Sequence, residues 1–433
     1  MKKISNILGL WLLMLAMVTV VACEGSDAPY NGYVETTQDN AATLVLKGYE
    51  NPQAGFTVFE PDGFQSPFYI QDKTFYGKQY AFVKSTSTRL DEMKNRPEAD
   101  AWQAEGVPVV DGATYWAHTE TLAAHQYVKF RVCSISGNNV TIEYVVEEDV
   151  KPNANANAKD KSGYSLNLEI PRLNEANVFV AHSLKVNGAE LLNYALEWDD
   201  TKKHSSWVAF AFDETTRKAG DGVKRKDNFV VDPLLPEAMQ VTDEQHKSDG
   251  FDRGHICGSA DRLFTQEAND QTFYFSNMSP MIHSFNSPYW AEFEEQVRKW
   301  GGAERGVTTT YSKLYVVKGG ALNELLVNYT GTKKGGDQII PTTDENGFTI
   351  HGLACPKYYF MAVLSETDGV YHAIGFLAEH KEYSKAPTAD EVKARAVSID
   401  DLEEKTGIDF FCNLPDDLEN TVESDMNLDD WAW

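Results

Sequence analysis

The alternation of apolar and polar positions predicts two structured regions separated by a polar segment. Residues 127–135 and 140–146 alternate around a turn at residues 136–139 that contains serine, glycine and two asparagines. Period-two alternation on both sides of residues that tolerate positive φ is typical of a β-hairpin. Shorter candidate strands precede it at residues 43–46, 56–59 and 80–83. We therefore expect residues 24–150 to form a small β-rich, sandwich-like domain.

The polar segment covers residues 151–163 and has no apolar side chain larger than alanine other than Pro152. Such a composition is typical of a flexible linker and predicts a domain boundary. Beyond it, residues 164–433 contain longer apolar runs that we interpret as strands, some of them buried on both faces. These runs lie at residues 207–212, 313–317, 357–364 and 371–377. A second domain built on a central sheet follows from this pattern.

Two helices are predicted in the second domain. Ser287 is a candidate N-cap with Pro288 at the first helical position, and an apolar stripe follows every three or four residues. A later helix is expected to open at Asp400, with Glu403 at the spacing of a capping box, and to stop at Gly407.

The first residues are typical of a targeting segment and do not belong to the fold. Lys2 and Lys3 precede an uncharged run over residues 4–22, and small Ala22 stands immediately before Cys23. This arrangement resembles a bacterial lipoprotein signal, which implies that residues 1–22 are removed and that Cys23 carries a lipid. A transmembrane anchor is the alternative, because the run nearly reaches the ~20 residues that span a bilayer. We expect an exported protein, held by its lipid at the outer membrane or the cell surface.

Charge limits how the protein can meet a partner. The chain of 433 residues has 65 acidic and 39 basic residues, a formal net charge of −26. That balance excludes nucleic-acid binding by a broad basic surface, which draws its affinity from phosphate neutralisation. From Asp401 onward the chain has eleven acidic residues against one lysine, and we expect this acidic C-terminal tail to repel a polyanion. Between Lys202 and Lys226 the balance is reversed, with seven basic residues against three acidic ones.

The remaining cysteines do not suggest a metal site. Cys133, Cys257, Cys355 and Cys412 show no C-x-x-C spacing, which argues against a zinc site built on thiolates. Export permits a disulfide without requiring one. Four cysteines allow three pairings, and four free buried cysteines remain the alternative.

The candidate chemistry lies in and after the run Asp252-Arg253-Gly254-His255. Asn277 and Asn286 follow, and the first predicted helix carries Glu294 and Arg298 on the face that leads back to Asn286. An amide oxygen with a carboxylate two turns further along can hold a hard cation partly through water, as Mg²⁺ prefers. The alternative is that these residues have no catalytic role: Glu294 and Arg298 would be a surface ion pair, and Asn286 would be a helix cap.

These residues and their spacings resemble the DNA/RNA non-specific endonuclease family. The resemblance extends over roughly residues 166–423 and includes residues 193–198 and 207–210. It implies an α+β fold, a mixed nuclease domain with a central antiparallel sheet and a ββα-metal finger.

The resemblance also implies roles for individual residues. His255 would be the general base that deprotonates the attacking water, a task suited to a side chain whose pKa lies near 6.5. Asn286 would bind Mg²⁺ directly, with Mn²⁺ or another divalent ion as an alternative cofactor. Glu294 would hold a metal-bound water. The ion would neutralise charge that develops on the phosphate and on the leaving oxygen.

Three arginines and one asparagine complete the implied site. Arg253, Arg298 and Arg225 resemble the family's phosphate-contacting arginines, and Asn277 resembles a residue that supports the site. The chain departs from the family at Met281, where glutamine is common, and this departure affects the loop rather than the proton transfer.

The sequence thus predicts an exported, magnesium-dependent endonuclease that hydrolyses DNA and RNA to 5′-phosphate products. Two alternatives remain: an inactive surface lipoprotein that uses the nuclease fold for binding, and a metal phosphodiesterase that acts on another substrate.

Overall fold

The computed structural model describes residues 36–433 except 56, 61–67, 78–79, 105, 305, 310 and 334–338. The predicted signal and Cys23 lie outside the described residues. Within them the chain forms two compact units, one of residues up to 118 with 127–147, and one of residues 119–126 with 148–433. No helix of the described residues has both the length and the apolar character needed to cross a bilayer.

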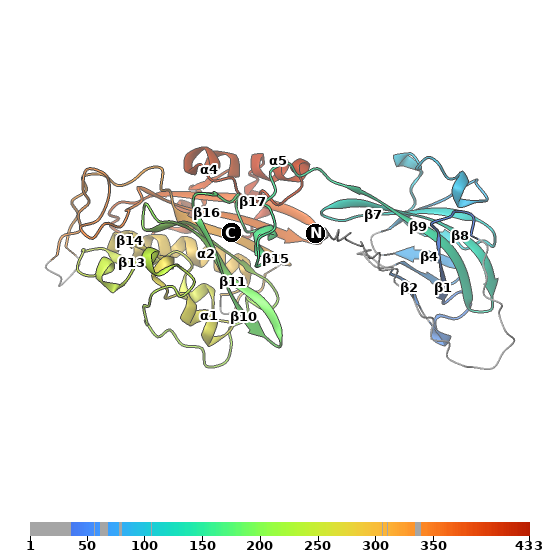
Figure 1. Cartoon of the computed structure of the whole chain (residues 1–433), viewed down its shortest axis with the longest axis horizontal. Coiled ribbons are helices and arrows are strands. Elements are labelled where there is room, and N and C mark those ends of the chain that lie inside the picture. Colours follow the sequence, from blue (N-terminus) through green and yellow to red (C-terminus); the bar gives the residue numbers. More distant parts are fainter. Residues whose placement is uncertain are drawn as a thin grey trace, which may run out of the picture. The chain divides into compact units, whose positions relative to one another are not determined.

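The first unit contains two antiparallel sheets (Figure 1). A five-stranded sheet has the order β1-β9-β8-β7-β5, formed by Ala42–Lys47, Asn139–Val150, Ala124–Ser136, Thr114–Glu120 and Ala81–Lys84. A four-stranded sheet has the order β2-β3-β4-β6, formed by Val58–Phe59, Phe68–Gln71, Thr74–Gly77 and Val107–Pro108. One aromatic core takes side chains from both sheets, and Phe68 of β3 stacks on Phe130 of β8. The predicted β-rich sandwich and its hairpin are confirmed.

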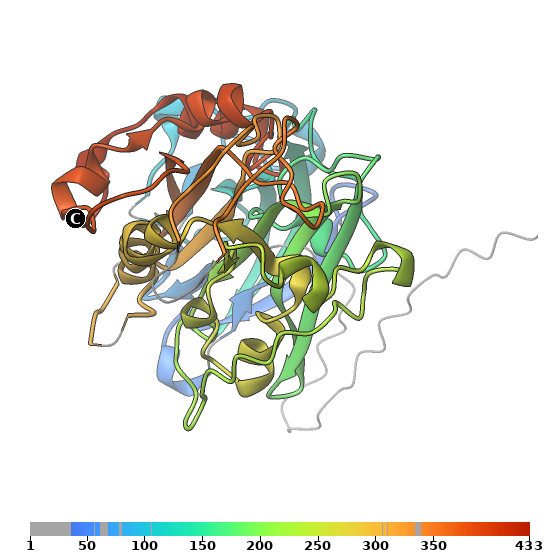
Figure 2. The ribbon, with the colours of Figure 1, turned by 90° about the vertical axis from the view of Figure 1, so that its left-hand side faces the viewer.

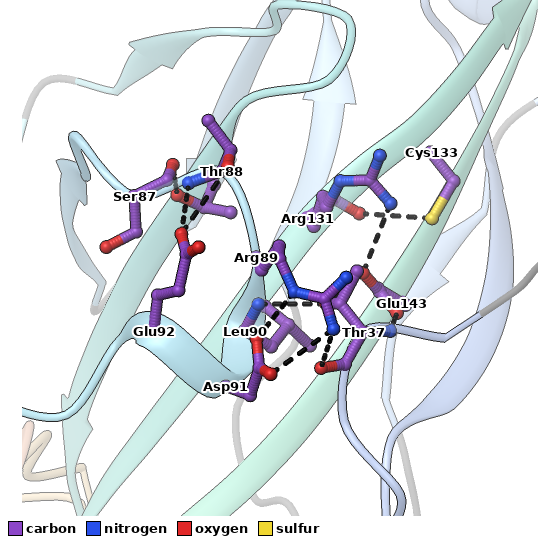
Figure 3. Close-up of polar contacts among 11 residues, drawn as sticks. Thr37, Ser87, Thr88, Arg89, Leu90, Asp91, Glu92, Arg131, Cys133 and Glu143 are labelled. Carbon is purple, nitrogen blue, oxygen red and sulfur yellow. Dashed lines mark hydrogen bonds and ion pairs between the residues drawn. The ribbon is translucent and has the colours of Figure 1, made fainter.

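A buried carboxylate in this unit is fully partnered. Glu143 on β9 is 0% exposed and accepts hydrogen bonds from the backbone N–H of Thr37 and from its hydroxyl, both at 2.6 Å. Arg131 on β8 forms an ion pair with the same carboxylate at 3.3 Å. Figure 3 shows these groups converging on Glu143. Because every oxygen has a donor, this glutamate joins three segments without leaving a buried charge uncompensated.

The segment over residues 151–163 differs from the predicted flexible linker, because it is anchored to the second unit. Asn153 donates to the carbonyl of Leu414 at 2.7 Å, and Asn155 donates to Asp409 and Glu419. Asn157 is buried and donates to the carbonyls of residues 165 and 171. The segment is held by hydrogen bonds from asparagine amides rather than by apolar side chains. Its polar composition therefore did not predict that it packs on the second unit.

The second unit is built on a seven-stranded antiparallel sheet with the order β10-β11-β12-β15-β16-β17-β18. Its strands are Val178–Val186, Ala189–Asp199, His204–Phe212, Lys313–Gly320, Tyr358–Thr367, Val370–Glu379 and Ala396–Val397. All four strands predicted for this domain are present, and the predicted central antiparallel sheet is confirmed. Alternate residues face opposite sides, so that Val316 contributes to one core and Val317 to the other.

One face of this sheet carries the ββα element. Strands β13 (Asp252–His255) and β14 (Met278–Met281) pair antiparallel, and helix α2 (Ala291–Gly301) follows them. The helix was predicted to start at Pro288, but the regular helix begins at Ala291 after a wider turn, η9, over Phe285–Trp290. Ser287 has extended backbone angles, as expected of a residue before proline. The short helices α1 (Gln266–Gln271) and α3 (Ala389–Lys393) lie elsewhere in the chain.

The opposite face carries α4 (Ile399–Thr406) and α5 (Asp416–Ser424), drawn in red in Figures 1 and 2. The N-cap of α4 is Ser398, whose hydroxyl accepts from the backbone N–H of Asp401, so the predicted capping box at Asp400 is wrong. A serine two residues earlier satisfies the free N–H instead. Gly407 ends the helix in the left-handed region, as predicted.

The residues of the acidic C-terminal tail are folded onto the second unit. Val422 of α5 packs into the core on the α4 side, and Trp431 packs into the core on the α2 side. Charge counting had obscured these apolar anchors, because they are few and widely spaced. The four cysteines within the described residues are free; three of them are buried, as in the alternative considered from the sequence, and Cys133 is partly exposed.

Candidate active site

The hairpin of β13 and β14 places the two halves of the predicted site side by side. Asp252 is opposite Met281, and Gly254 is opposite Ser279. A Cβ at Gly254 would overlap the thioether sulfur of Met281, so a larger residue there would require that buried side chain to move. Buried side chains from the sheet hold β14 in place: His204 and the hydroxyl of Tyr359 both contact Oγ of Ser279, at 2.6 and 2.5 Å.

A pocket of about 210 Å³ collects six of the seven predicted nuclease-site residues. Its polar lining comes from β13, the loop after it, η9, α2 and the basic stretch near residue 225. The lining residues are Arg225, Arg253, His255, Gly258, Ser259, Ala260, Asn286, Glu294 and Arg298. Residues separated by more than seventy positions thus meet in one place.

His255 ends β13 between aromatic rings. The ring of Phe273 lies edge-on at 4.8 Å, and Phe229 lies at 5.9 Å. Burial, with the nearby cations Arg225 and Lys318, lowers the pKa of His255 from 6.5 to about 3. Among the described residues, no group forms a hydrogen bond with its buried Nε2 atom. At neutral pH this imidazole is therefore uncharged, so that one ring nitrogen keeps its lone pair.

Asn286 is oriented by Asp252. Its amide nitrogen donates to Oδ2 of Asp252 at 2.9 Å, and Nδ1 of His283 contacts the same oxygen at 2.8 Å. The amide nitrogen is thereby engaged, and the amide oxygen is the group of Asn286 that remains for a ligand. The side chain of His283 is about half exposed.

Glu294 belongs to a buried ion network that was only partly predicted. Nζ of Lys318 forms an ion pair with Glu294 and a second one, at 3.5 Å, with Asp261. Asp261 also pairs with Arg298 at 3.2 Å. Burial alone would lower the pKa of Lys318, but Glu294 and Asp261 outweigh it and raise that pKa. The alternative interpretation, a surface ion pair of Glu294 with Arg298, does not hold, because Glu294 pairs with Lys318 and Arg298 pairs with Asp261.

Lys318 and Asp261 were missed by the sequence interpretation. Lys318 lies on β15, on the same side as Val316, and is 2% exposed. A lysine inside an apolar strand signals a buried ion pair, because an unpaired ammonium is costly to bury. That signal was present in residues 313–320 but did not name the partners, which come from α2 and from the loop after β13.

The remaining arginines hold different positions. Arg225 contacts Asp227 at 2.7 Å and Oγ of Ser259 at 3.1 Å, with about half of its side chain exposed. Arg253 pairs with Asp243 at 2.6 Å, and its guanidinium lies 4.9 Å from the ring of Phe229. Both cations are partly accessible at the pocket.

Asn277 does not line the pocket. It is 0% exposed. Its amide oxygen accepts a hydrogen bond from the backbone N–H of Cys257, and its amide nitrogen donates to the carbonyls of Cys257 and Thr272. These contacts clamp the loop that follows His255, which makes Asn277 a brace for the pocket wall.

A second hollow of about 1200 Å³ shares Ala260 and Arg298 with the pocket. Its walls include residues 217–222, 302–304 and 306–309. Arg217, from the predicted basic stretch, is committed to backbone carbonyls of residues 213, 311 and 312. Lys218 is mainly exposed and contacts Glu214 at 3.5 Å.

Comparisons with known proteins show which family the chain is similar to. A model of the DNA/RNA non-specific endonuclease family matches residues 175–417. A nuclease of Nostoc sp. is 28% identical over 237 residues, covering 54% of this chain and 76% of the relative. A nuclease of Syncephalastrum racemosum is 30% identical, and the match covers 52% of this chain and 67% of the relative. The mitochondrial endonuclease G of Homo sapiens is 25% identical and covers 51% and 68%.

Among solved structures, a crystal structure of the EndoG/EndoGI complex is similar to this chain. The sequence identity is 20% and the TM-score is 0.44. The match covers 60% of this chain and 94% of the other.

Proposed function

The chain belongs to the DNA/RNA non-specific endonuclease family and is a metal-dependent endonuclease, and from this premise we propose that it hydrolyses the phosphodiester bonds of DNA and RNA to 5′-phosphate products. The observation that carries the proposal is the pocket in which His255, Asn286, Glu294 and three arginines meet. An uncharged base, oxygen ligands and cations around one small space are what phosphodiester hydrolysis needs.

The donor set fits a hard divalent ion, and we propose Mg²⁺. Asp252 holds the amide nitrogen of Asn286, so that the amide oxygen is the donor, and Glu294 adds a carboxylate that would hold a metal-bound water. Oxygen donors of low total charge suit Mg²⁺, which keeps several waters of its own. When bound, the ion would neutralise charge on the phosphate and on the leaving oxygen.

The chain's own residues would carry the proton and hold the phosphate. Neutral His255 would accept a proton from water as the water oxygen forms a bond to phosphorus. The bond from phosphorus to the 3′ oxygen breaks, leaving a 5′-phosphate, and the 3′ oxygen takes a proton from solvent. Arg225 and Arg253, partly exposed at the pocket, would bind non-bridging oxygens.

Lack of sugar preference follows from what the pocket offers. Its cations recognise phosphate, which DNA and RNA share, rather than the 2′ position that distinguishes them. The adjoining hollow at Arg298 offers space for the nucleotides next to the scissile bond.

The location of the protein is a separate proposal that depends on residues 1–23. We propose export and lipid attachment at Cys23, supported by the lysines, the uncharged run and the small residue before that cysteine. Metabolic labelling with palmitate tests it: label should enter the parent chain and not a Cys23→Ala variant. Equal labelling of both would contradict lipidation at this residue.

The proposed activity is tested with plasmid DNA and with RNA, each with and without a chelator. We expect both polymers to be cut, chelator to abolish cutting, and 5′-labelling of the products to require prior phosphatase treatment. Asn286→Ala should raise the metal concentration needed for half-maximal activity, while His351→Ala, at an exposed histidine, should match the parent. A chain that cuts neither polymer but binds them would support the binding alternative, and one that hydrolyses only small phosphodiesters would support the other alternative.

A further inference from the structure

A group of carboxylates gathers where α4 and α5 meet, away from the catalytic pocket. Asp400 and Glu403 lie on α4, three residues apart, and Glu423 lies in the last turn of α5. One oxygen from each lies within 4.8 Å of the others. Because α4 and α5 pack into the core on the other side of the sheet from α2, this acidic site is separate from Asn286 and Glu294. We call Asp400, Glu403 and Glu423 the α4–α5 carboxylates.

One member of this group is buried without a partner. Glu423 is 7% exposed, and no described residue forms a hydrogen bond with its buried Oε1 atom. Its place at the end of α5 makes the ionised form of Glu423 still less favourable, because the last turn has no basic residue and the helix dipole is negative there. An ionised carboxylate in such a place requires a compensating positive charge.

The surroundings do not supply that charge from a side chain. Within the described part of the chain, no lysine, arginine or histidine forms an ion pair with the α4–α5 carboxylates. Lys405 of the same helix is turned toward Glu324 instead. Glu403 accepts a hydrogen bond from the backbone N–H of Phe410 at 2.6 Å, which compensates only one oxygen.

Two further acids increase the negative charge nearby. Asp409 and Glu419 both accept a hydrogen bond from the amide of Asn155, which is neutral and does not balance their negative charge. Burial, with repulsion from Glu403, Glu419, Asp409 and Asp400, raises the pKa of Glu423 to about 9. Burial and neighbouring acids likewise raise the pKa of Glu403 to about 7. These carboxylates therefore hold either protons or a cation at neutral pH.

We propose that Asp400, Glu403 and Glu423 form a structural site for a hard divalent cation, with Ca²⁺ as the best fit, that joins α4 to α5. Calcium binds oxygen ligands at about 2.3–2.6 Å, so oxygens on opposite sides of the ion can be about 5 Å apart. The spacing of the three carboxylates agrees with that span. Asp400 is exposed, which leaves room for water to complete a coordination number of six to eight.

Direct binding tests the site on the full chain. Calcium uptake is measured by equilibrium dialysis with CaCl₂ at pH 7.5 for the Asn286→Ala variant, in which the proposed catalytic ligand is absent. We expect one tightly held Ca²⁺ per chain and a rise in Tm with calcium concentration, since a ligand that binds only the folded state stabilises it. Weaker or no response to MgCl₂ at equal concentration would fit the size of the site.

Two substitutions identify the residues. Glu423→Gln should weaken calcium binding at least tenfold and still fold, because it removes a buried charge without changing shape. Glu404→Gln, at an exposed acid on the same helix, is the matched control and should bind as the Asn286→Ala parent does. Because all proteins in this test carry Asn286→Ala, the result is independent of the proposed nuclease mechanism.

Three outcomes would overturn the proposal. One is the absence of stoichiometric calcium uptake, with a Tm that does not depend on calcium. Another is equal binding by the Glu423→Gln and Glu404→Gln variants, which would place the ion elsewhere. The third is uptake that appears only far above pH 9, which would mean that Glu423 simply holds a proton.

Discussion

The catalytic pocket and the α4–α5 carboxylates occupy opposite faces of one sheet, and they treat buried acids in different ways. Glu294 and Asp261, at the pocket, share the ammonium of Lys318. Glu423, on the other face, has no hydrogen-bond partner among the described residues for one of its oxygens. In the first unit, Glu143 follows the pocket's pattern, with Thr37 and Arg131 as partners.

The difference lies in how the negative charge of each buried carboxylate is balanced. Where the chain supplies a cation of its own, the charge of the acid is already balanced within the protein. Where the chain supplies none, the charge has to be balanced by a proton or by a metal ion. The charges of Glu294 and Asp261 are thus balanced by Lys318, whereas the junction of α4 and α5 is expected to depend on calcium.

Removing the internal cation should break the pocket's pattern and give the largest effect. Lys318→Met leaves Glu294 and Asp261 buried without their shared ammonium, and breaking such a pair typically costs about 3–5 kcal/mol. We expect a loss of that size in the free energy of unfolding, measured by urea titration. Lys318→Met combined with Asp261→Asn should recover part of it. A change below about 1 kcal/mol in the single variant would show that water replaces the lysine.

Removing the base should separate activity from stability. His255→Ala is expected to lower the turnover of plasmid cleavage by at least ~10²-fold, as is typical for loss of a general base, equivalent to about 2.7 kcal/mol. Its Tm should stay close to the parent's, because Nε2 of His255 has no hydrogen bond to lose within the described residues. Glu423→Gln is the counterpart on the other face and should keep full cleavage. Near-normal turnover in folded His255→Ala would rule out the base assignment.

The sequence predicted the pocket better than its surroundings, for a physical reason. His255, Asn286 and Glu294 occur at short spacings on a hairpin and a helix, and local geometry brings them together. Lys318 comes from a strand that reaches the pocket only through sheet pairing, so its partners depend on long-range topology. The folding of residues 416–431 was missed because two apolar anchors, Val422 and Trp431, were outnumbered by acidic residues in the composition.

Acid should act on the α2 side of the sheet through buried neutral histidines. Burial, with the positive charge of Arg253 nearby, lowers the pKa of His246 to about 3, against 6.5 when unfolded. Between these values the unfolded chain binds the extra proton, so the stability from this residue is complete above pH 6.5 and is lost as the pH falls toward 3. The loss is about 1.4 kcal/mol per pH unit.

His246→Phe isolates this contribution. The substitution keeps an aromatic ring against Phe275, which His246 contacts at 5.4 Å. We expect the slope of unfolding free energy against pH, measured between pH 6 and 4.5, to fall by about 1.4 kcal/mol per unit. His351→Phe, at an exposed histidine, should keep the parent slope. An unchanged slope in His246→Phe would show that the folded protein already protonates this ring.

The acidic residues of α5 should give the smallest effect, because they lie on the face opposite the pocket. From the sequence alone we expect this segment to repel nucleic acid. Truncation is unsuitable, since it would take Trp431 out of the core.

Neutralising exposed Asp417 and Asp425 to asparagine keeps the fold and removes two charges. At 0.1 M salt the screening length is about 10 Å, so charges beyond the sheet act weakly on a strand at the pocket. We expect KM for plasmid to change by less than about twofold at that salt, with a somewhat larger fall at 0.01 M, where screening extends to about 30 Å. A severalfold fall at 0.1 M would mean that the substrate's path passes close to α5, and would join the two faces that the structure separates.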